Sequence, residues 1–272
     1  MIHHTVNETT VTIGQATATV ICDSLDKTRL TTVELVYPRY IHSELMTHRV
    51  FSRNASSSRA TPLSVTLEEV ENNPAFFDYV GRNKAGMVAG DELTGDKLED
   101  FKKEWAYLGK VVADAVRGMS FRYGIHKQTL NRALEPWLYI RTLVTATEWS
   151  NFFKLRLAED AQPEIQSLAK AIKQSMALSV PKDTTIHLPY VREDEMDNPE
   201  IYKASVARCA RVSYARLDGK PDDFEADKVL YERLLKGGHL SPFEHVAYAM
   251  SGYSRFYANF ACWQSLRNHM EE

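Results

Sequence analysis

Residues 11 to 37 carry the first regular pattern of the chain, an alternation of apolar and polar side chains. A period of two residues is typical of β-strands that turn one face to a core, so strands are predicted here. Pro38 follows directly, and proline is well tolerated at the first position of a helix. We therefore expect a helix that starts at Pro38 and runs through Thr47.

A second pattern, with steps of three and four, lies in the segment DKLEDFKKEWAYLGKVVADAV. Its apolar positions are Leu98, Phe101, Trp105, Leu108, Val112 and Ala115. This spacing places them on one face of an amphipathic helix. Weaker patterns predict further helices at about 147–157, 161–179, 198–213 and 222–236.

The segment MALSVPKDTTIHLPYVREDEMDNPE interrupts the regular patterns with three prolines and an acidic cluster. We interpret residues 180–198 within it as a connector inside one fold, which separates a helical region from the final quarter of the chain. The prediction is a single domain over residues 1–272. Its parts are an opening loop at 43–60, a helical part at 97–180 and a C-terminal part at 199–272.

Composition and charge fit a globular protein and exclude some functions. The 272 residues are 44% hydrophobic and 10% aromatic, which is enough for a sizeable core. With 33 basic and 36 acidic residues, the net charge of −3 argues against broad electrostatic capture of nucleic acid. The N-terminus lacks the pattern of a secretory signal, and no apolar run approaches the roughly 18 residues of a membrane span. Neither secretion nor membrane insertion is expected.

Cys22, Cys209 and Cys262 are odd in number and far apart. They form neither a disulfide framework nor a C-x-x-C metal pair. A reducing cytoplasm is therefore the predicted location.

The opening loop, SELMTHRVFSRNASSSRA, crowds hydroxyl, amide and guanidinium side chains into positions 52 to 59. Short hydroxyl side chains and turn N–H groups suit a phosphate, which Arg59 can bind with two hydrogen bonds. Alternatively, Ser and Asn are present because they favour turns, while His48 and Arg49 stabilise a helix C-terminus. Composition leaves both interpretations open.

A second polar group stands on an aromatic face in TATEWSNFFKLRLAEDAQPEIQ. In a helix to about residue 157, Trp149, Phe152, Phe153 and Arg156 lie on one side. Burying a guanidinium is costly unless a ligand pairs with it, so Arg156 is a candidate to face a flat polar ring. The alternative is a cation–π contact or a partly solvated arginine at the core.

The segment GGHLSPFEH, residues 237–245, has the form of a capping box with Ser241, Pro242 and Glu244. This predicts an ordinary helix start. A helix N-terminus also attracts phosphate, and His239 and His245 flank this one. Their spacing does not match H-E-x-x-H, so no metal site is predicted.

The segment YGIHKQTLNRALEPW, residues 123–137, gathers polar side chains that include Lys127, Asn131 and Arg132. A solvated helix surface explains them without any function. Only proximity to the other loops would change that interpretation.

Taken together, these motifs resemble a known family. THRVFSRNASSSRA is similar to the signature of flavin-dependent thymidylate synthases of the ThyX type, Arg-His-Arg-x-x-Ser-x-Asn-Glu-x-Ser-x-Arg-Tyr. The positions in register are His48, Arg49, Ser52, Asn54, Ser57 and Arg59. NFFKLRLAEDAQPEIQ resembles the downstream block of the family at Asn151, Arg156, Gln162 and Glu164. NRALEP resembles the segment that supplies a phosphate-binding arginine, here Arg132.

The order of the motifs differs from that family. ARVSY and GGHLSPFEH stand near the C-terminus here, whereas similar segments precede the signature loop in the usual member. The chain therefore looks circularly permuted, which leaves site geometry intact when the old termini lie close together. Thr47 and Ala55 also replace the Arg and Glu of the signature. These two departures bear on which pyrimidine is bound and what happens at its C5.

The resemblance implies an α+β protein of ThyX-like fold, with a central, mostly antiparallel sheet flanked by helices and permuted connectivity. The implied reaction transfers a one-carbon unit from methylenetetrahydrofolate to C5 of dUMP, with FAD reduced by NADPH and then supplying a hydride. The implied assembly is a homotetramer with shared active sites, in which residues 199–272 complete the flavin site. Because no cysteine lies in a motif, attack by a thiolate is not expected.

The same resemblance implies roles for individual residues. Arg156, against the uracil, and His239 would be catalytic. Substrate binding is assigned to Glu44, Ser57, Ser58, Arg59, Arg132 and Arg156. FAD binding is assigned to His48, Arg49, Asn54, Asn151, Ser213, His239, Ser241 and Glu244. Asn54 and His239 would lie nearer the isoalloxazine.

Two alternatives stay open at this point. One is a related C5 modification, such as hydroxymethylation, of another pyrimidine nucleotide. The other is a nucleotide- or flavin-binding homologue without catalysis. In every case the expected partner is a small molecule, with no nucleic acid and no membrane.

Overall fold

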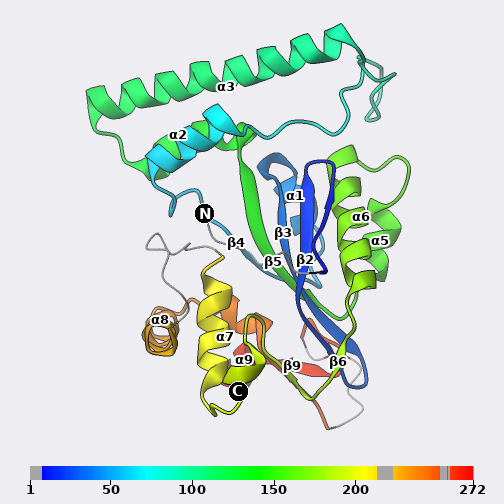
Figure 1. Cartoon of the computed structure of the whole chain (residues 1–272), viewed down its shortest axis with the longest axis vertical. Coiled ribbons are helices and arrows are strands. Elements are labelled where there is room, and N and C mark those ends of the chain that lie inside the picture. Colours follow the sequence, from blue (N-terminus) through cyan, green and yellow to red (C-terminus); the bar gives the residue numbers. More distant parts are fainter. Residues whose placement is uncertain (1–7, 213–222, 252–255, 257, 272) are drawn as a thin grey trace.

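The computed structural model describes residues 8–212, 223–251, 256 and 258–271, and its centre is a six-stranded sheet (Figure 1). The strands are β1 (Val11–Ile13), β2 (Ala16–Leu25), β3 (Arg29–Pro38), β4 (Ser52–Ala55), β5 (Tyr139–Ala146) and β6 (Lys182–Asp183). The order is β1-β2-β3-β5-β4, all antiparallel, and β6 pairs with β2 in parallel. The prediction of an α+β protein with a mostly antiparallel sheet is confirmed.

Helices pack against this sheet, and further helices lie beyond both of its ends (Figure 1). The α-helices are α1 (His42–Met46), α2 (Leu63–Asn72), α3 (Asp96–Tyr123), α4 (Lys127–Leu130), α5 (Ser150–Arg156), α6 (Pro163–Leu178), α7 (Ile201–Ala210), α8 (Phe224–Lys236) and α9 (Leu266–Glu271). The 3-10 helices are η1 (Arg39–Ile41), η2 (Asn131–Trp137), η3 (Glu193–Glu195) and η4 (Ser241–His245). A small sheet holds β7 (Ile186–His187), β8 (Ala247–Ala249) and β9 (Trp263–Ser265). Within the described residues, no helix has the length and apolarity needed to cross a bilayer.

Apolar burial divides among three main clusters. The first joins the sheet to α5 and α6 and includes Leu35, Phe152 and Ile172. A second lies among α7, α8 and η4. A third joins α2, α3 and η2 at the other end. The predicted amphipathic helix is therefore α3. Trp105 and Val112 of its predicted apolar face pack on α2 and η2, but Leu108 and Ala115 are exposed, because the buried side of the helix runs through Gly109, Ala113 and Val116 instead.

The turn between β1 and β2 requires glycine at position 14. Gly14 has φ +54°, a conformation that residues with a side chain rarely adopt. A Cβ at this position would also lie 2.2–2.4 Å from the carboxyl group of Asp78. Asp78 accepts a hydrogen bond from the backbone N–H of Gln15 at 2.7 Å, which ties this turn to the loop after α2.

The sequence pattern misplaced the start of the first helix and missed several strands, among them β4 and β5 of the main sheet. Pro38 belongs to β3, with ψ 128°, and the first helical turn begins at Arg39. Arg39 N–H donates to Leu138 O at 2.8 Å, which continues the pairing with β5 past the end of the strand. β5 is buried on both faces for most of its length, so it lacks the alternation that marked β2 and β3. β4 lies inside the predicted opening loop and is polar, because it is a short edge strand.

A chain of hydrogen-bonded polar side chains crosses the interior from β2 to η4. Both ring nitrogens of His187 make hydrogen bonds. Nδ1 lies 2.8 Å from Ser24 Oγ, and Nε2 lies 2.7 Å from Thr32 Oγ1. Thr32 and Thr145 hydroxyls are 2.6 Å apart, and Thr145 is 2.7 Å from His245 Nδ1. Both histidines are fully buried. The chain therefore anchors β7 and η4 to the main sheet through groups that cannot reach water.

Because these two histidines are buried, we expect the free energy of unfolding to fall on mild acidification. Burial lowers the pKa of His187 and of His245 to about 3, below the ordinary value near 6.5. Between these values the unfolded chain binds protons that the folded protein does not, so acid favours unfolding. We expect each histidine to lower the free energy of unfolding by about 2 kcal/mol between about pH 7.5 and about pH 5. Urea unfolding at both pH values measures this loss.

A His187→Gln variant is the control for this expectation, because it removes one titrating group. Burial also lowers the pKa of His42 and of His48, so a pH dependence from these residues persists in the variant. The variant should nevertheless lose less stability than the wild type over the same interval. Equal losses in the two proteins would exclude His187 as a source of acid sensitivity.

Candidate functional site

The candidate site is built along β4, the edge strand of the main sheet. β4 pairs with β5 on one side. On its other side the C-terminal part approaches: Ser241 Oγ donates to the Arg53 carbonyl at 2.9 Å. Asn54 Nδ2 donates to the Cys209 carbonyl, at the end of α7, also at 2.9 Å. Segments nearly 200 positions apart in sequence therefore meet at one short strand.

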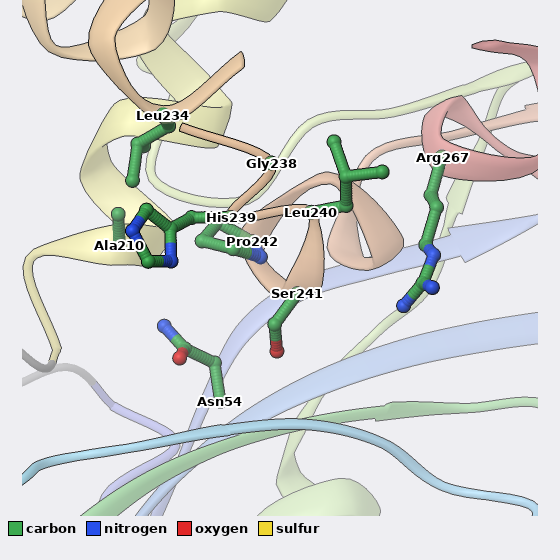
Figure 2. Close-up of a pocket in the computed structure, with 9 residues that line it drawn as sticks. All are labelled: Asn54, Ala210, Leu234, Gly238, His239, Leu240, Ser241, Pro242 and Arg267. Carbon is green, nitrogen blue, oxygen red and sulfur yellow. The ribbon is translucent and has the colours of Figure 1, made fainter. Parts of the chain in front are cut away.

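A cavity of about 320 Å³ opens where β4, α7 and η4 meet (Figure 2). Its lining residues are Asn54, Ala210, Leu234, Gly238, His239, Leu240, Ser241, Pro242 and Arg267. Figure 2 shows the Asn54 side chain pointing from β4 toward His239, with Ser241 to its right. The cavity therefore combines an apolar wall with an amide, an imidazole, a hydroxyl and a guanidinium. It brings together three of the residues predicted for the cofactor.

A smaller cavity of about 180 Å³ lies next to the first. Ser52, Glu244 and Arg267 are among its lining residues, and Arg267 also lines the larger cavity. Arg267 Nη1 donates to Glu244 Oε1 at 2.6 Å. Glu244 therefore lies in the site beside Arg267. This arginine, on α9, was not predicted from the sequence motifs.

At the C-terminal end of β4, the opening loop meets η2 around the carboxylate of Glu135. Three groups converge on Glu135 Oε1: Ser58 Oγ at 2.9 Å, Arg132 Nη1 at 3.0 Å and Arg39 Nε at 3.2 Å. Asn131 is fully buried beneath the loop and donates to Ser58 O at 2.7 Å. The predicted phosphate-binding serine and Arg132 thus lie side by side. Arg39 and Glu135 are parts of this cluster that the sequence analysis did not predict.

Cations outnumber anions around this loop. Lys127 Nζ donates to Ala60 O at 2.7 Å, which places a fourth basic group beside the loop with Arg39, Arg59 and Arg132. Arg59 is exposed and has no hydrogen bond or ion pair with another residue that the structure describes. Ser57, half-buried, precedes it. A surface that gathers these four basic side chains is suited to binding an anion such as phosphate.

At the N-terminal end of β4, Arg156 contacts the opening loop. Its Nε donates to His48 Nε2 at 2.9 Å, and its terminal nitrogen donates to Thr47 Oγ1 at 3.0 Å and to Glu44 O at 3.2 Å. Burial, together with the Arg156 charge, lowers the pKa of His48. His48 is therefore a neutral acceptor, and the predicted role of its charge at a helix C-terminus is wrong. Arg156 supplies the cation at that end of α1 instead.

The predicted aromatic face of α5 belongs to the core. Trp149 and Phe152 are buried, and each packs against Phe51, with ring centroids 4.7 and 5.4 Å apart. Phe153 stacks on Trp149 at 6.1 Å. Phe152 also meets the His48 ring edge-on at 4.9 Å. The aromatic side chains therefore support the loop from below, while Arg156 at the end of the face is half-buried beside the loop.

The capping box predicted at residues 241–244 is absent. Leu240 occupies the N-cap position of η4, and Ser241 is the first residue inside it. The Ser241 hydroxyl donates to β4 and Glu244 pairs with Arg267, so neither caps the helix. His245, on the other side of η4, belongs to the buried polar chain and does not line the cavity.

Two predicted cofactor residues, Arg49 and Asn151, line neither cavity. Arg49 is exposed beyond the end of α1, and Asn151 is exposed on α5. Neither has a hydrogen bond or ion pair with another described residue, and neither lines the two cavities. Ser213 lies outside the described residues.

The cysteines and the possible metal ligands bear on two kinds of chemistry, attack by a thiolate and binding of a metal ion. Burial raises the pKa of the Cys22 thiol to about 11 and raises that of Cys209 well above its ordinary value. Both thiols are therefore poor nucleophiles at neutral pH. Among the residues that the structure describes, no group of three or more His, Cys, Asp or Glu side chains is arranged to hold a metal ion.

Comparisons with known proteins point to one family. A family model described as thymidylate synthase complementing protein matches residues 29–182. No curated protein matches the chain. Thymidylate synthase X from Helicobacter pylori, solved with FAD and dUMP, has 20% identity and a TM-score of 0.36 over 54% of this chain and 67% of that one. The UMP/dUMP methylase PolB from Streptomyces cacaoi, bound with 5-Br UMP, has 16% identity and a TM-score of 0.46 over 60% of this chain and 88% of that one.

Proposed function

The chain belongs to the family of thymidylate synthase complementing proteins, and we propose that it is a flavin-dependent thymidylate synthase. In the proposed reaction, a one-carbon unit passes from methylenetetrahydrofolate to C5 of dUMP, and NADPH is the reductant. The observation that supports this most is the convergence on β4. Its two ends and its free edge hold Arg156, the Ser58–Arg132 cluster and the cavity with His239.

We assign the Ser58–Arg132 cluster to the phosphate of the nucleotide. Arg132 and Ser58 share one carboxylate oxygen of Glu135, which holds both donors in place before a ligand arrives. Arg59, exposed beside them, adds a cation for a bidentate contact. Asn131 fixes the loop backbone from below. The proposed task of this cluster is to orient the pyrimidine by gripping the far end of the nucleotide.

We assign the larger cavity to part of FAD, because its lining suits that group. Leu234, Leu240 and Pro242 offer an apolar wall for a flat ring, while Asn54 and His239 offer hydrogen-bonding groups at its edge. Arg267 supplies a positive charge suited to a phosphate of the cofactor. When bound, FAD supplies the hydride that completes the new methyl group.

Arg156 is the proposed catalytic cation for the uracil. Its guanidinium is half-buried, so charge on a bound ring would be screened less than in open water. A donor directed at a uracil carbonyl stabilises electron density that moves toward C5. Through Nε, Arg156 also keeps His48 Nε2 unprotonated. The thiolate route is not proposed, because burial raises the pKa of Cys22 and Cys209.

The decisive test is the mass of the product. The full chain is incubated without oxygen with FAD, NADPH, methylenetetrahydrofolate and either dUMP or dCMP. We expect dUMP to gain a methyl group. A hydroxymethyl gain, or activity on dCMP alone, would replace this proposal with the related C5 modification. No product and no flavin bound after FAD is added would point to a homologue without catalysis.

A variant at Arg132 tests the proposed phosphate site, and a variant at Arg82 is its matched control. Arg132→Ala should raise KM for dUMP by about tenfold or more, because it removes a charge-assisted contact to phosphate. Arg82→Ala, an arginine on the loop before α3, removes the same charge elsewhere and should leave KM unchanged. Equal KM values for both variants would separate Arg132 from the substrate.

A further inference from the structure

The carboxylate of Glu135 takes the same donors that we assign to the phosphate of the nucleotide. Ser58 Oγ donates to Glu135 Oε1 at 2.9 Å, and Arg132 Nη1 donates to it at 3.0 Å. Arg39 Nε lies 3.2 Å from the same oxygen. The other oxygen, Oε2, accepts no hydrogen bond from a residue that the structure describes. Two cations and a hydroxyl are therefore drawn to one oxygen atom of a single side chain.

This arrangement is crowded for a carboxylate and suits a phosphate better. A carboxylate oxygen has about two lone pairs, so three donors cannot all reach an ideal acceptor position on Oε1. A phosphate monoester has three terminal oxygens and carries a charge of about −1.5 to −2 near pH 7, against −1 for a carboxylate. Each of the three donors can then face an oxygen of its own. Exchange of the carboxylate for a phosphate relieves the crowding and places more negative charge against the two arginines.

The Glu135 side chain is able to leave these donors without a change in the backbone. It is 26% exposed, so solvent already reaches it. The Glu135 carbonyl accepts from the Leu138 N–H at 3.2 Å, and the Leu138 carbonyl accepts from the Arg39 N–H at 2.8 Å. Asn131 holds the loop by donating to Ser58 O at 2.7 Å. Rotation of one side chain about its own bonds therefore uncovers the donors and leaves η1, η2 and the loop in place.

We propose that Glu135 is an internal competitor of the nucleotide phosphate. The substrate binds by displacing the carboxylate from Ser58, Arg132 and Arg39, and the carboxylate returns to these donors as the product nucleotide leaves. The competition weakens the binding of substrate and product alike, so it keeps the cluster from retaining the product. This inference rests on the proposed function, because it takes the Ser58–Arg132 cluster as the site of the phosphate.

The sign of the change in affinity tests this inference. Glu135→Gln keeps the shape of the side chain and removes its charge. Where a competing contact leaves about one molecule in ten ready to bind, its removal lowers the dissociation constant by about tenfold. We expect this fall for dUMP and for inorganic phosphate, measured by calorimetry on the full chain. If Glu135 only held Ser58 and Arg132 in place, the variant would bind both ligands more weakly. That result, or unchanged dissociation constants, would overturn the proposal.

Two controls separate competition from a general gain of positive charge. Glu68→Gln removes the same charge from α2, at an exposed position that makes no hydrogen bond or ion pair with another described residue. It should leave both dissociation constants unchanged. Deoxyuridine, which lacks the phosphate, should bind equally to the wild type and to Glu135→Gln. An equal fall in Glu68→Gln, or a fall for deoxyuridine as well, would show that Glu135 does not compete with the phosphate.

The rate of product release tests the return of the carboxylate. The methylated nucleotide, dTMP, keeps the phosphate of dUMP, so Glu135 competes with it in the same way. Glu135→Gln should release dTMP about tenfold more slowly, because differences in affinity at one site act mostly through the dissociation rate. Loss of labelled dTMP from the full chain into an excess of unlabelled dTMP measures this rate. Equal rates in the two proteins would contradict the return of Glu135 to its donors.

These measurements require no turnover, so they separate the inference from the proposed reaction. Tighter binding of phosphate and dUMP by Glu135→Gln, without any product from the wild type, would support the competitor and count against the thymidylate synthase. Methylation of dUMP by the wild type, without tighter binding in the variant, would do the reverse. No binding of either ligand to either protein would contradict both.

Discussion

An Arg156→Ala variant is expected to lose nearly all turnover while remaining folded. Arg156 links α5 to the opening loop through the side chains of His48 and Thr47 and the backbone carbonyl of Glu44. Removing a donor directed at developing charge typically lowers kcat by about 10² to 10³. Anaerobic turnover with dUMP measures this, and the thermal unfolding transition checks the fold.

Lys154→Ala is the control for this expectation, because Lys154 is exposed on the same helix and makes no hydrogen bond or ion pair with another residue that the structure describes. It should keep wild-type turnover. Arg156→Lys is a second control: it retains a positive charge but loses the planar donor fork, and so should recover only part of kcat. Wild-type turnover in Arg156→Ala would show that the arginine only supports the loop.

The largest loss of stability is expected from Asp227→Ala. Asp227 is fully buried on α8 and pairs with Arg208 at 2.9 Å and with Arg211, while Arg208 also binds Glu195. Removing this buried carboxylate takes one counter-charge from Arg208 and one from Arg211, and breaking a buried ion pair in this way costs about 3–5 kcal/mol. Urea unfolding should show the loss. Because Arg208 and Cys209 are neighbours on α7, binding of FAD should weaken as well.

Glu225→Ala tests whether this loss is specific to the buried pair. Glu225 is an acid on the same helix but exposed, so its removal should change the free energy of unfolding by about 0.5 kcal/mol or less. If Asp227→Ala were as stable as Glu225→Ala, the buried cluster would contribute nothing to holding α7 on α8.

The periodic pattern of apolar and polar residues predicted those strands and helices that have one buried face and one exposed face. β2, β3, α3 and α6 each turn one face to the core, and the expected ranges came within a few residues except at the C-terminal end of α3. β5 escaped because it is buried on both faces, and β4 because an edge strand of four polar residues has no apolar pattern. Pro38 was misassigned because proline suits both the end of a strand and the start of a helix.

The sequence motifs predicted those residues of the candidate site that lie on β4 or pack against it. Asn54, His239 and Ser241 line one cavity, and Ser58 meets Arg132. Arg267, Arg39 and Glu135 were not foreseen, because they act through contacts between distant segments that no local spacing encodes. The family model ends at residue 182, before ARVSY and GGHLSPFEH, so the permuted order stays a prediction.

The two sides of β4 are held in different ways. Toward β5, the strand is joined by backbone pairing in register from Ser52 to Ala55. Toward the C-terminal part, the recorded bonds run through side chains, from Ser241 to Arg53 and from Asn54 to Cys209. Side-chain bonds exchange with water far more readily than a backbone ladder. Loss of either side-chain bond would therefore loosen one wall of the cavity and leave the ladder between β4 and β5 intact.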